Sequence, residues 1–279
     1  MPTVAVNGVK LNYLVRGKGP PIVLSHGLQN SVFAFTPILD PLAQRFRVFA
    51  LDKRGHGDSQ KPPGPYRIQD FADDLLGFLD ALGLERVDFL GHSMGGRTGT
   101  LFAAGHSDRL SRLMLVSSSA GPPSGAYRKH FEVLQRVAAE EGMEAVFNHN
   151  EFRRLIPPKM LEGPPGQEYR KRFLKNTPET YAASANALFT MPDLTGRLGE
   201  ISVPTWVCYG ENDPGPLDFS DIYLERIPNC TRVILPGSGH FPIWDSTGAF
   251  LAALEDFLAR FPIPQPPLGA SEQKSPGRP

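Results

Sequence analysis

The segment Gly91-His92-Ser93-Met94-Gly95-Gly96 constrains the fold of this chain more than any other. It follows a short apolar run at 87–90 and precedes residues 97–104, whose small and apolar side chains are typical of a helix. A strand, a tight turn with the pattern Gly-x-Ser-x-Gly and a helix together form a nucleophile elbow. The strained turn lifts the serine to its tip and leaves no room for neighbouring Cβ atoms, which explains the glycines. The pattern therefore predicts that Ser93 is a nucleophile.

Apolar runs alternate with helical patterns on both sides of this turn. Continuous runs of this kind suit strands that are buried on both faces of a parallel sheet; they occur at 21–24, 47–51 and 113–116. Residues 68–82 instead place apolar side chains at helical spacing, and Gly83 ends that helix. The alternation predicts an α/β fold with a mostly parallel central sheet flanked by helices. At the N-terminus, an Asn7-Gly8 turn predicts a β-hairpin.

The alternation of strand-like and helical patterns stops between residues 121 and 197. Apolar residues there keep helical spacing without a strand-like run, and proline pairs break the pattern into short helices. We expect a helical cap insertion over the carboxyl edge of the sheet; the alternative is a long crossover with no role in substrate binding. Residues 1–120 and 198–261 would then form the α/β core. The tail, residues 262–279, is rich in Pro, Gly and polar residues and is expected to be disordered.

The insertion also carries large apolar side chains whose helical spacing fits packing within the cap as well as contact with a substrate. They are Phe147, Phe152, Leu155, Phe173, Leu188, Phe189 and Met191. An apolar cleft for a medium-sized acyl group is therefore expected, while the pattern does not select which of these residues face it.

The composition excludes several classes of function. The 279 residues carry a formal net charge of +0, so there is no electrostatic footprint for nucleic acid or an anionic membrane. No stretch is long enough for a membrane span, and the N-terminus has no signal-peptide pattern. Two cysteines do not suggest a disulfide framework, so a cytoplasmic setting is expected. The expected partner is a small-molecule substrate, and the oligomeric state stays open.

A catalytic serine needs a base that takes its proton and an acid that orients the base. Among the seven histidines, His240 follows the last predicted strand, where an open parallel sheet places its ligand chemistry. The glycines at 237 and 239 let this loop fold inward. His92 adjoins Ser93 on the turn itself, so its side chain cannot easily face the serine. We therefore predict that His240 is the base.

The acid is expected between Ser93 and His240 in the chain, as in the order Ser, acid, His. Gly210-Glu211-Asn212-Asp213-Pro214 follows the predicted strand 205–209. Both carboxylates could serve, and the Gly-x-x-Asp spacing favours Asp213 over Glu211. The alternative for Asp213 is ordinary turn chemistry, because Asp before Pro is common in turns.

An oxyanion hole requires two backbone N–H groups near the nucleophile. One is expected from Met94, the residue after Ser93, and the other from Leu28, in the loop that follows the first buried strand. We expect His26 to brace this loop rather than to transfer protons. The His, Cys and carboxylate positions show no metal-ligand spacing, and the predicted chemistry requires neither a metal nor a cofactor.

Four motifs in this order resemble the α/β-hydrolase superfamily, in particular its small capped members. They are Ser25-His26-Gly27, Arg54-Gly55-His56-Gly57-Asp58-Ser59, Gly91 to Gly96, and Gly239-His240-Phe241. The resemblance extends from about Val4 to Phe261 and implies a serine hydrolase with a catalytic triad. It also implies that the second motif is a structural loop, so that His56 is not catalytic.

Four features bear on the type of reaction that the resemblance implies. Family members that attack with Asp are excluded by Ser93, which suits esters, lactones, thioesters or C–C cleavage beside a ketone. C–C hydrolases usually carry Asn before the serine, and enol-lactone hydrolases tend to carry Leu or Phe there, whereas this chain has His92. Residues 62–66 and 80–86 are nevertheless similar to the enol-lactone hydrolases of aromatic catabolism. Arg97 is similar to the arginine of a lyase on this fold, or it lies behind the site.

We therefore predict a serine hydrolase that cleaves small carboxylic esters or lactones through an acyl-enzyme intermediate. The alternatives are an enol-lactone or C–C bond hydrolase, a lyase or acyltransferase on the same triad, and a protein that uses the pocket for binding alone. A complete set of Ser, Asp and His disfavours the last, since binding alone does not require it.

Overall fold

The computed structural model describes residues 1–215 and 218–263. One eight-stranded sheet has the order β1-β2-β4-β3-β5-β6-β7-β8. β1 pairs antiparallel with β2, and β2 with β4, while every other neighbouring pair is parallel. The predicted mostly parallel α/β sheet is thus confirmed. The strands are β1 Thr3–Val6, β2 Val9–Arg16, β3 Pro21–Ser25, β4 Arg47–Leu51, β5 Val87–His92, β6 Leu110–Val116, β7 Thr205–Gly210 and β8 Cys230–Leu235.

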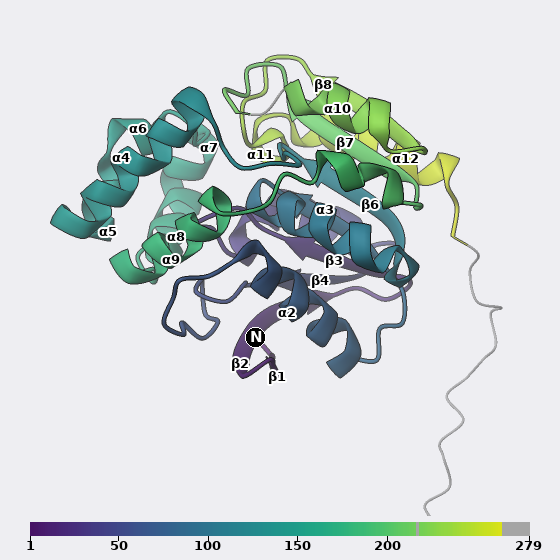
Figure 1. Ribbon diagram of the computed structural model, residues 1–279, viewed down its shortest axis with the longest axis horizontal. Helices are drawn as coiled ribbons and strands as arrows, with labels where there is room; N and C mark the ends of the chain where they lie inside the picture. Colours follow the sequence, from purple (N-terminus) through teal and green to yellow (C-terminus); the bar gives the residue numbers. More distant parts are fainter. Residues whose placement is uncertain (216–217, 264–279) are drawn as a thin grey trace, which may run out of the picture.

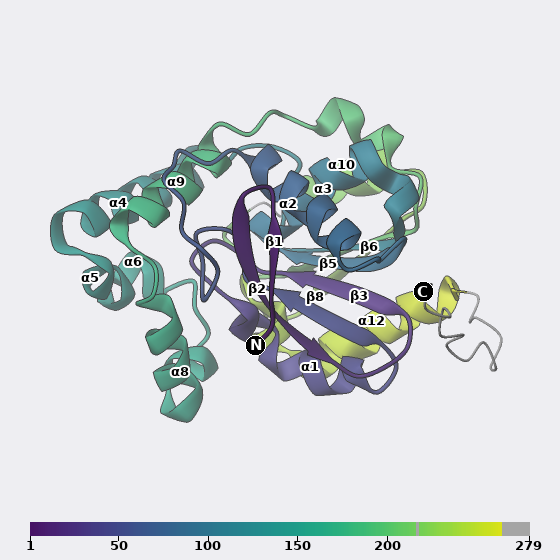
Figure 2. The ribbon, with the colours of Figure 1, turned by 90° about the horizontal axis from the view of Figure 1, so that it is seen from below.

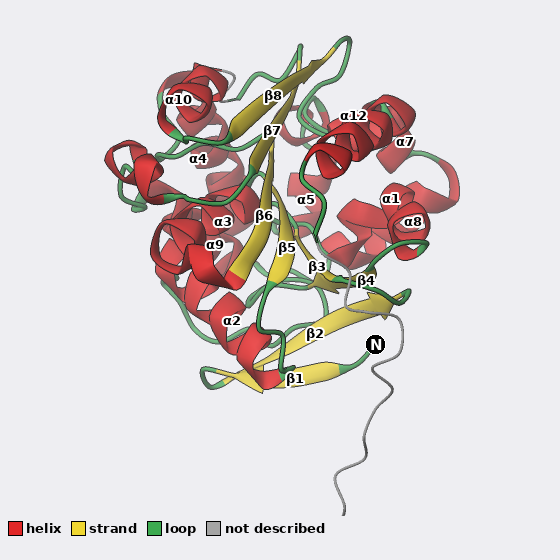
Figure 3. Ribbon diagram, turned by 90° about the vertical axis from the view of Figure 1, so that its right-hand side faces the viewer, coloured by secondary structure: helices red, strands yellow, loops and turns green. Residues whose placement is uncertain are grey.

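Helices cover both faces of this sheet (Figure 3). On one face lie α2 (Ile68–Ala81), α3 (Met94–His106) and α10 (Asp218–Arg226); on the other lie α1 (Thr36–Ala43) and α12 (Thr247–Arg260). Successive residues of β5 separate the two core layers, because side chains alternate across a strand. Phe89 packs in the layer with Phe78 of α2, whereas Leu90 packs in the layer with Phe250 of α12. Both strand residues are fully buried.

Shorter elements complete this part of the chain. They are the 3-10 helices η1 Val32–Phe35, η2 Ser107–Arg109 and η3 Thr195–Glu200, and the one-turn helix α11 Pro242–Asp245. No helix among the described residues is long and apolar enough to cross a membrane. The two cysteines are free thiols, Cys208 buried and Cys230 partly buried.

Six α-helices come between β6 and β7. They are α4 Gly125–Glu141, α5 Met143–Asn148, α6 Asn150–Arg153, α7 Pro158–Leu161, α8 Gly163–Phe173 and α9 Pro178–Phe189. Figure 1 and Figure 2 both show this group, coloured teal to green, projecting to one side of the sheet. Its two ends meet, since the N–H of Leu194 donates to the carbonyl of Ala120 at 2.7 Å. We call residues 121–197 the cap segment; the division of the chain into domains stays a prediction. Of the tail predicted to be disordered, all but residues 262 and 263 lies outside the described residues.

Candidate active site

Ser93 lies between β5 and α3 with φ 53° and ψ −115°, a left-handed conformation that is rare for a residue with a side chain. Its N–H donates to the carbonyl of Val116 at 2.8 Å. The neighbouring glycines are required by space: a Cβ on Gly91 would lie 2.4 Å from the carbonyl oxygen of Gly95, and one on Gly95 would lie 2.0 Å from that of Ser25. The local sequence therefore produces the sharp turn that presents the serine.

Two loops at the carboxyl ends of the last strands bring His240 and Asp213 to this serine. Nε2 of His240 lies 3.1 Å from Oγ of Ser93. On the other side of the ring, Nδ1 lies 3.0 and 3.1 Å from the two carboxylate oxygens of Asp213. All three residues are buried. The structure thus forms the hydrogen-bonded chain Ser93–His240–Asp213; the catalytic role of each residue stays a prediction.

The environment of Asp213 keeps its carboxylate ionised. Burial alone would raise the pKa of Asp213, but the charge and hydrogen bond of His240, together with the Gly215 N–H at 2.9 Å, bring the pKa below its ordinary value. The competing candidate, Glu211, contacts a different group. Its carboxylate accepts the N–H of Gly237 at 2.9 Å, at the start of the loop that carries His240.

The backbone around Leu28 and Met94 fits the predicted oxyanion hole. A Cβ on Gly27 would lie 3.2 Å from Cβ of Ser93, so this loop approaches the nucleophile closely. Among residues 1–215 and 218–263, neither the N–H of Leu28 nor that of Met94 donates to another protein group. Met94 is the first residue of α3, where helical N–H groups have no partner in the helix. Both donors are therefore available; their role stays a prediction.

His26 and His92 are neutral and structural. His26 Nδ1 lies 2.7 Å from the carbonyl of Gly27 and Nε2 accepts the N–H of Lys53 at 3.2 Å, so the ring braces the loop as expected. His92 Nε2 lies 2.8 Å from the carbonyl of His240 and ties the elbow to the loop of the base. Burial lowers the pKa of His92 to about 3 and that of His26 well below its ordinary value.

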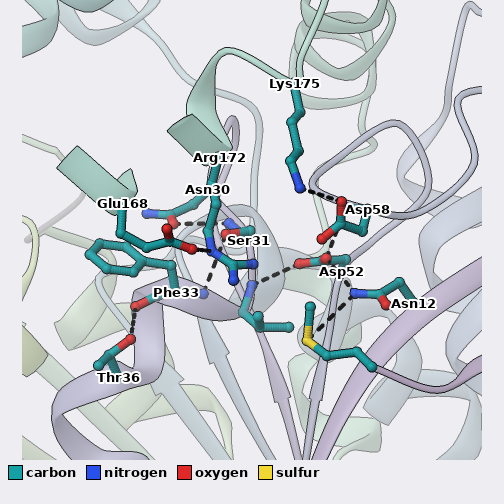
Figure 4. Close-up of polar contacts among 12 residues, drawn as sticks. Asn12, Asn30, Ser31, Phe33, Thr36, Asp52, Asp58, Glu168, Arg172 and Lys175 are labelled. Atoms are coloured by element: carbon teal, nitrogen blue, oxygen red, sulfur yellow. Dashed lines mark hydrogen bonds and ion pairs between the residues drawn. The ribbon is translucent and has the colours of Figure 1, made fainter. Parts of the chain in front are cut away.

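Asp52 organises the loop of the second motif (Figure 4). Its buried carboxylate accepts hydrogen bonds from Nδ2 of Asn12, from the N–H of Val32 and from the N–H of Asp58, all at 2.8 to 3.0 Å. Asp58 in turn forms an ion pair with Lys175 of the cap segment. His56 lies in the same loop, with Nδ1 2.9 Å from the carbonyl of Arg54, and does not line the pocket of Ser93. These contacts fit a structural loop.

A pocket opens above Ser93 between the core and the cap segment, with about 470 Å³ of empty volume, part of it open to solvent. We call its two sides the core wall and the cap wall. The core wall is formed by Gly27, Leu28, Gln29, His92, Ser93, His240 and Phe241. The cap wall is formed by Tyr127, His130, Phe131, Leu134, Phe152, Leu155, Ile156, Tyr169 and Tyr181. Of the seven apolar cap residues considered from the sequence, only Phe152 and Leu155 face this pocket.

The pocket is aromatic and carries no formal charge. Its walls contain no Lys, Arg, Asp or Glu among the described residues. Three buried polar groups in the walls, Nε2 of Gln29, Nδ1 of His92 and the hydroxyl of Tyr181, have no hydrogen-bond partner within the described chain. Buried polar groups are normally paired, so all three are suited to a polar atom of a bound molecule. No group of three or more His, Cys, Asp or Glu in the described ranges could hold a metal ion.

Tyr127 of α4 is the polar group of the cap wall nearest the reacting atoms. Its hydroxyl lies 3.3 Å from Nε2 of His240. Sequence reasoning did not select this residue, because nothing in the pattern of α4 shows which turn meets the sheet. Arg97 is buried but lies outside the pocket of Ser93; its Nε donates to the carbonyl of Gly121 at 3.3 Å. It is therefore a residue behind the site.

Comparison with known proteins agrees with this geometry. A model of the α/β hydrolase fold matches residues 20–140. The crystal structure of the enol-lactonase from Burkholderia xenovorans LB400 superposes with a TM-score of 0.84 at 32% sequence identity, covering 92% of this chain and 100% of that one. A thermophilic esterase from Thermogutta terrifontis gives a TM-score of 0.81 at 29% identity, with 93% and 97% covered.

A similar relationship is found among curated sequences. The 3-oxoadipate enol-lactonase 2 of Acinetobacter baylyi is 27% identical over 263 residues, which cover 93% of this chain and 97% of that protein. Enol-lactonases and an esterase thus show comparable similarity to this chain, and the comparison does not by itself select a substrate.

Proposed function

The chain belongs to the α/β-hydrolase superfamily, and from this premise we propose that it is a serine hydrolase that cleaves small, uncharged carboxylic esters or lactones. The observation that carries the proposal is the hydrogen-bonded chain from Ser93 through His240 to Asp213, at distances of 3.0 to 3.1 Å. It supplies a nucleophile, a base and an acid in the order that acyl transfer requires.

In the first half of the reaction, Oγ of Ser93 attacks the carbonyl carbon while Nε2 of His240 takes the hydroxyl proton. Asp213 holds the imidazole in the tautomer with its proton on Nδ1 and stabilises the imidazolium that forms. The N–H groups of Leu28 and Met94 receive the oxyanion. The imidazolium then returns the proton to the leaving oxygen, and the acyl-enzyme remains.

Water completes the second half. His240 takes a proton from a water molecule that attacks the acyl carbon, and the acid is released as Ser93 recovers its proton. Apart from the substrate and this water, all groups in these steps belong to the chain itself, and the proposal includes no cofactor or metal. A cytoplasmic setting stays a prediction from the two free cysteines.

The character of the pocket supports an uncharged substrate. A ligand carboxylate buried against the aromatic cap wall would meet no Lys or Arg side chain among the described lining residues. Burying an unpaired charge is costly. Simple esters and lactones fit better than an anionic enol-lactone, although the enol-lactone alternative keeps support from the relatives. Arg97 does not line the pocket, which argues against a lyase that would bind a substrate carboxylate through this arginine.

Labelling with a fluorophosphonate probe tests the central assignment. We expect one adduct on the intact protein, mapped by peptide mass spectrometry to Ser93, with loss of 4-nitrophenyl butyrate hydrolysis in parallel. An adduct on another residue, or none on an ester-hydrolysing enzyme, would refute the nucleophile.

Two further measurements separate the alternatives. Uncharged 4-nitrophenyl butyrate should be a better substrate than the anionic 4-nitrophenyl hemisuccinate, and a reversed preference would favour anionic substrates such as enol-lactones. Addition of methanol distinguishes hydrolysis from acyl transfer, because an acyltransferase would form mainly the methyl ester. Absence of turnover on every ester, lactone and C–C substrate would favour the binding protein.

A further inference from the structure

We propose that Tyr127 is an additional catalytic residue, whose hydroxyl donates a hydrogen bond to the leaving oxygen of the substrate. This inference rests on the proposed function of Ser93 and adds a group from the cap segment to it. The observation behind it is the contact between the Tyr127 hydroxyl and Nε2 of His240, at 3.3 Å.

Nε2 of His240 is approached by two hydroxyls. Because Nδ1 faces Asp213, the neutral ring carries its proton on Nδ1 and has one lone pair, on Nε2. Ser93 lies 3.1 Å from this nitrogen and Tyr127 lies 3.3 Å from it. One lone pair cannot serve two donors well. When Ser93 uses it, the hydroxyl of Tyr127 is left to donate to Oγ of Ser93 or to an atom that a substrate brings.

The position of that atom follows from the mechanism. In acylation, Nε2 passes its proton to the leaving oxygen, which must therefore lie within hydrogen-bond distance of Nε2. A hydroxyl 3.3 Å from the same nitrogen is close enough to reach an oxygen bound there. In deacylation, the attacking water occupies the corresponding place, and Tyr127 can orient it.

The ring of Tyr127 is held on several sides. It stacks on His130, with centroids 6.2 Å apart and an angle of 6° between the planes, and meets the edge of Phe131 at 4.9 Å. His130 is itself fixed by Glu151, whose carboxylate lies 3.2 Å from Nδ1. The loop that carries Asp213 also packs on the ring, since a Cβ on Gly215 would lie 3.3 Å from Cζ of Tyr127. These contacts hold the hydroxyl over His240, and burial raises the pKa of Tyr127, which keeps it protonated.

The step balances without loss of the tyrosine proton. The tetrahedral intermediate collapses, the C–O bond to the leaving group breaks, and its electron pair goes to the leaving oxygen. That oxygen receives the proton of the His240 imidazolium, and the carbonyl double bond re-forms. Tyr127 donates a hydrogen bond to the negative charge that develops before the proton arrives. Its contribution should increase as the leaving group becomes more basic.

Tyr127→Phe removes the hydroxyl and keeps the ring, so it tests this dependence. The substrates are three acetates with one acyl group and increasingly basic leaving groups: 4-nitrophenyl, phenyl and benzyl acetate. The parameter is kcat/KM, which reports acylation. We expect a loss within about threefold for the nitrophenyl ester and of about 10²- to 10³-fold for the benzyl ester, the order seen when one donor to a developing charge is lost.

Tyr181→Phe is the matched control, because it removes a second cap-wall hydroxyl that makes no contact with His240 in the described structure. It should lower all three rates by a common factor. An equal loss across the series in Tyr127→Phe, or no loss, would overturn the proposal for Tyr127. Failure of the proposed function gives a different result, namely a wild-type protein that hydrolyses none of the acetates or a Ser93→Ala variant that still does.

Discussion

The core wall and the cap wall enclose the same space and are built in different ways. On the core wall, Ser93 and His240 lie at the ends of strands and contact each other, and Asp213 contacts His240 from behind the wall. On the cap wall, aromatic rings contact one another, as Phe152 and Tyr169 do at 6.4 Å between centroids. Strand ends are fixed by the sheet, whereas ring positions depend on how several short helices pack. From this difference we expect the nucleophilic chemistry to depend on the core wall, and the choice of substrate, with the proposed help of Tyr127 to the leaving group, to depend on the cap wall.

Removing the nucleophile should have the largest effect and should not depend on the substrate. We expect Ser93→Ala to lower kcat by about 10⁶-fold, the order seen when a triad serine is lost. The steady-state rates on a short ester, a long ester and a lactone measure it. The variant should keep the far-UV circular dichroism of the wild type. Activity within a few-fold of wild type on any of the three substrates would show that Ser93 of the core wall is not the nucleophile for that substrate.

Asp213→Asn should come next, with a loss of about 10⁴-fold, because the amide favours the wrong tautomer of His240. Glu211→Gln is the matched control in the same loop. The amide oxygen of glutamine can still accept the N–H of Gly237, so the control should stay within a few-fold of wild type. If the control is the damaging change, the acid has been assigned to the wrong residue.

Lowering the pH should destabilise the folded chain, because its core contains buried neutral histidines. Burial lowers the pKa of His56 and of His92 to about 3, while the unfolded chain takes up these protons near pH 6.5. The folded state then binds fewer protons, so the free energy of unfolding falls as the pH drops from 6.5 toward 3. At pH 5 we expect a loss of roughly 2 kcal/mol for each histidine.

Urea unfolding at pH 7 and pH 5 measures this loss. His92→Asn removes one of these buried histidines and should reduce the fall in the free energy of unfolding by about the contribution of one histidine. An unchanged decline in the variant would show that His92 is not the source.

A change on the cap wall should have the smallest effect on rate and a clear effect on selectivity. Phe152→Leu widens the pocket, and we expect the ratio of kcat/KM for octanoate over acetate 4-nitrophenyl esters to rise about tenfold, since one or two methylenes in an apolar pocket are worth about that much. Phe147→Leu is the control, because Phe147 is also buried in the cap segment but lies outside the pocket. The ring centroids of Phe147 and Phe152 are 5.9 Å apart. Equal shifts in both variants would mean that cap stability, rather than the wall, sets selectivity.

The sheet could be predicted from the sequence because its strands are short apolar runs with clear ends. The run at 47–51 matches β4 residue for residue, and the Asn7-Gly8 turn joins β1 to β2 as expected. The one-turn helix α11 and η1 were not predicted, since elements of four residues leave no periodicity to detect. Helix α3 begins at Met94, directly after Ser93, where glycines hide the helical pattern.

The candidate site divides along the same line. Ser93, His240 and Asp213 could be selected because each follows a strand that the apolar runs reveal. Tyr127 and Tyr181 could not, because their places depend on the packing of the cap helices, and spacing alone does not tell a pocket-facing residue from a cap-packing one. For His92, the sequence shows only that it stands beside Ser93 on the turn. Its contact with the carbonyl of His240 joins positions 148 apart in the chain, and no local sequence pattern can predict such a contact.

The hydrogen bond between Leu194 and Ala120 makes the segment between them a closed loop. We expect both strands to stay in place when this segment is shortened, lengthened or replaced, since the entropy cost of a longer loop grows only with the logarithm of its length. Exchange of the whole segment between related chains is thus compatible with an unchanged sheet. This junction offers evolution, or an engineer, a place to exchange substrate preference, together with Tyr127, while Ser93, His240 and Asp213 stay where they are.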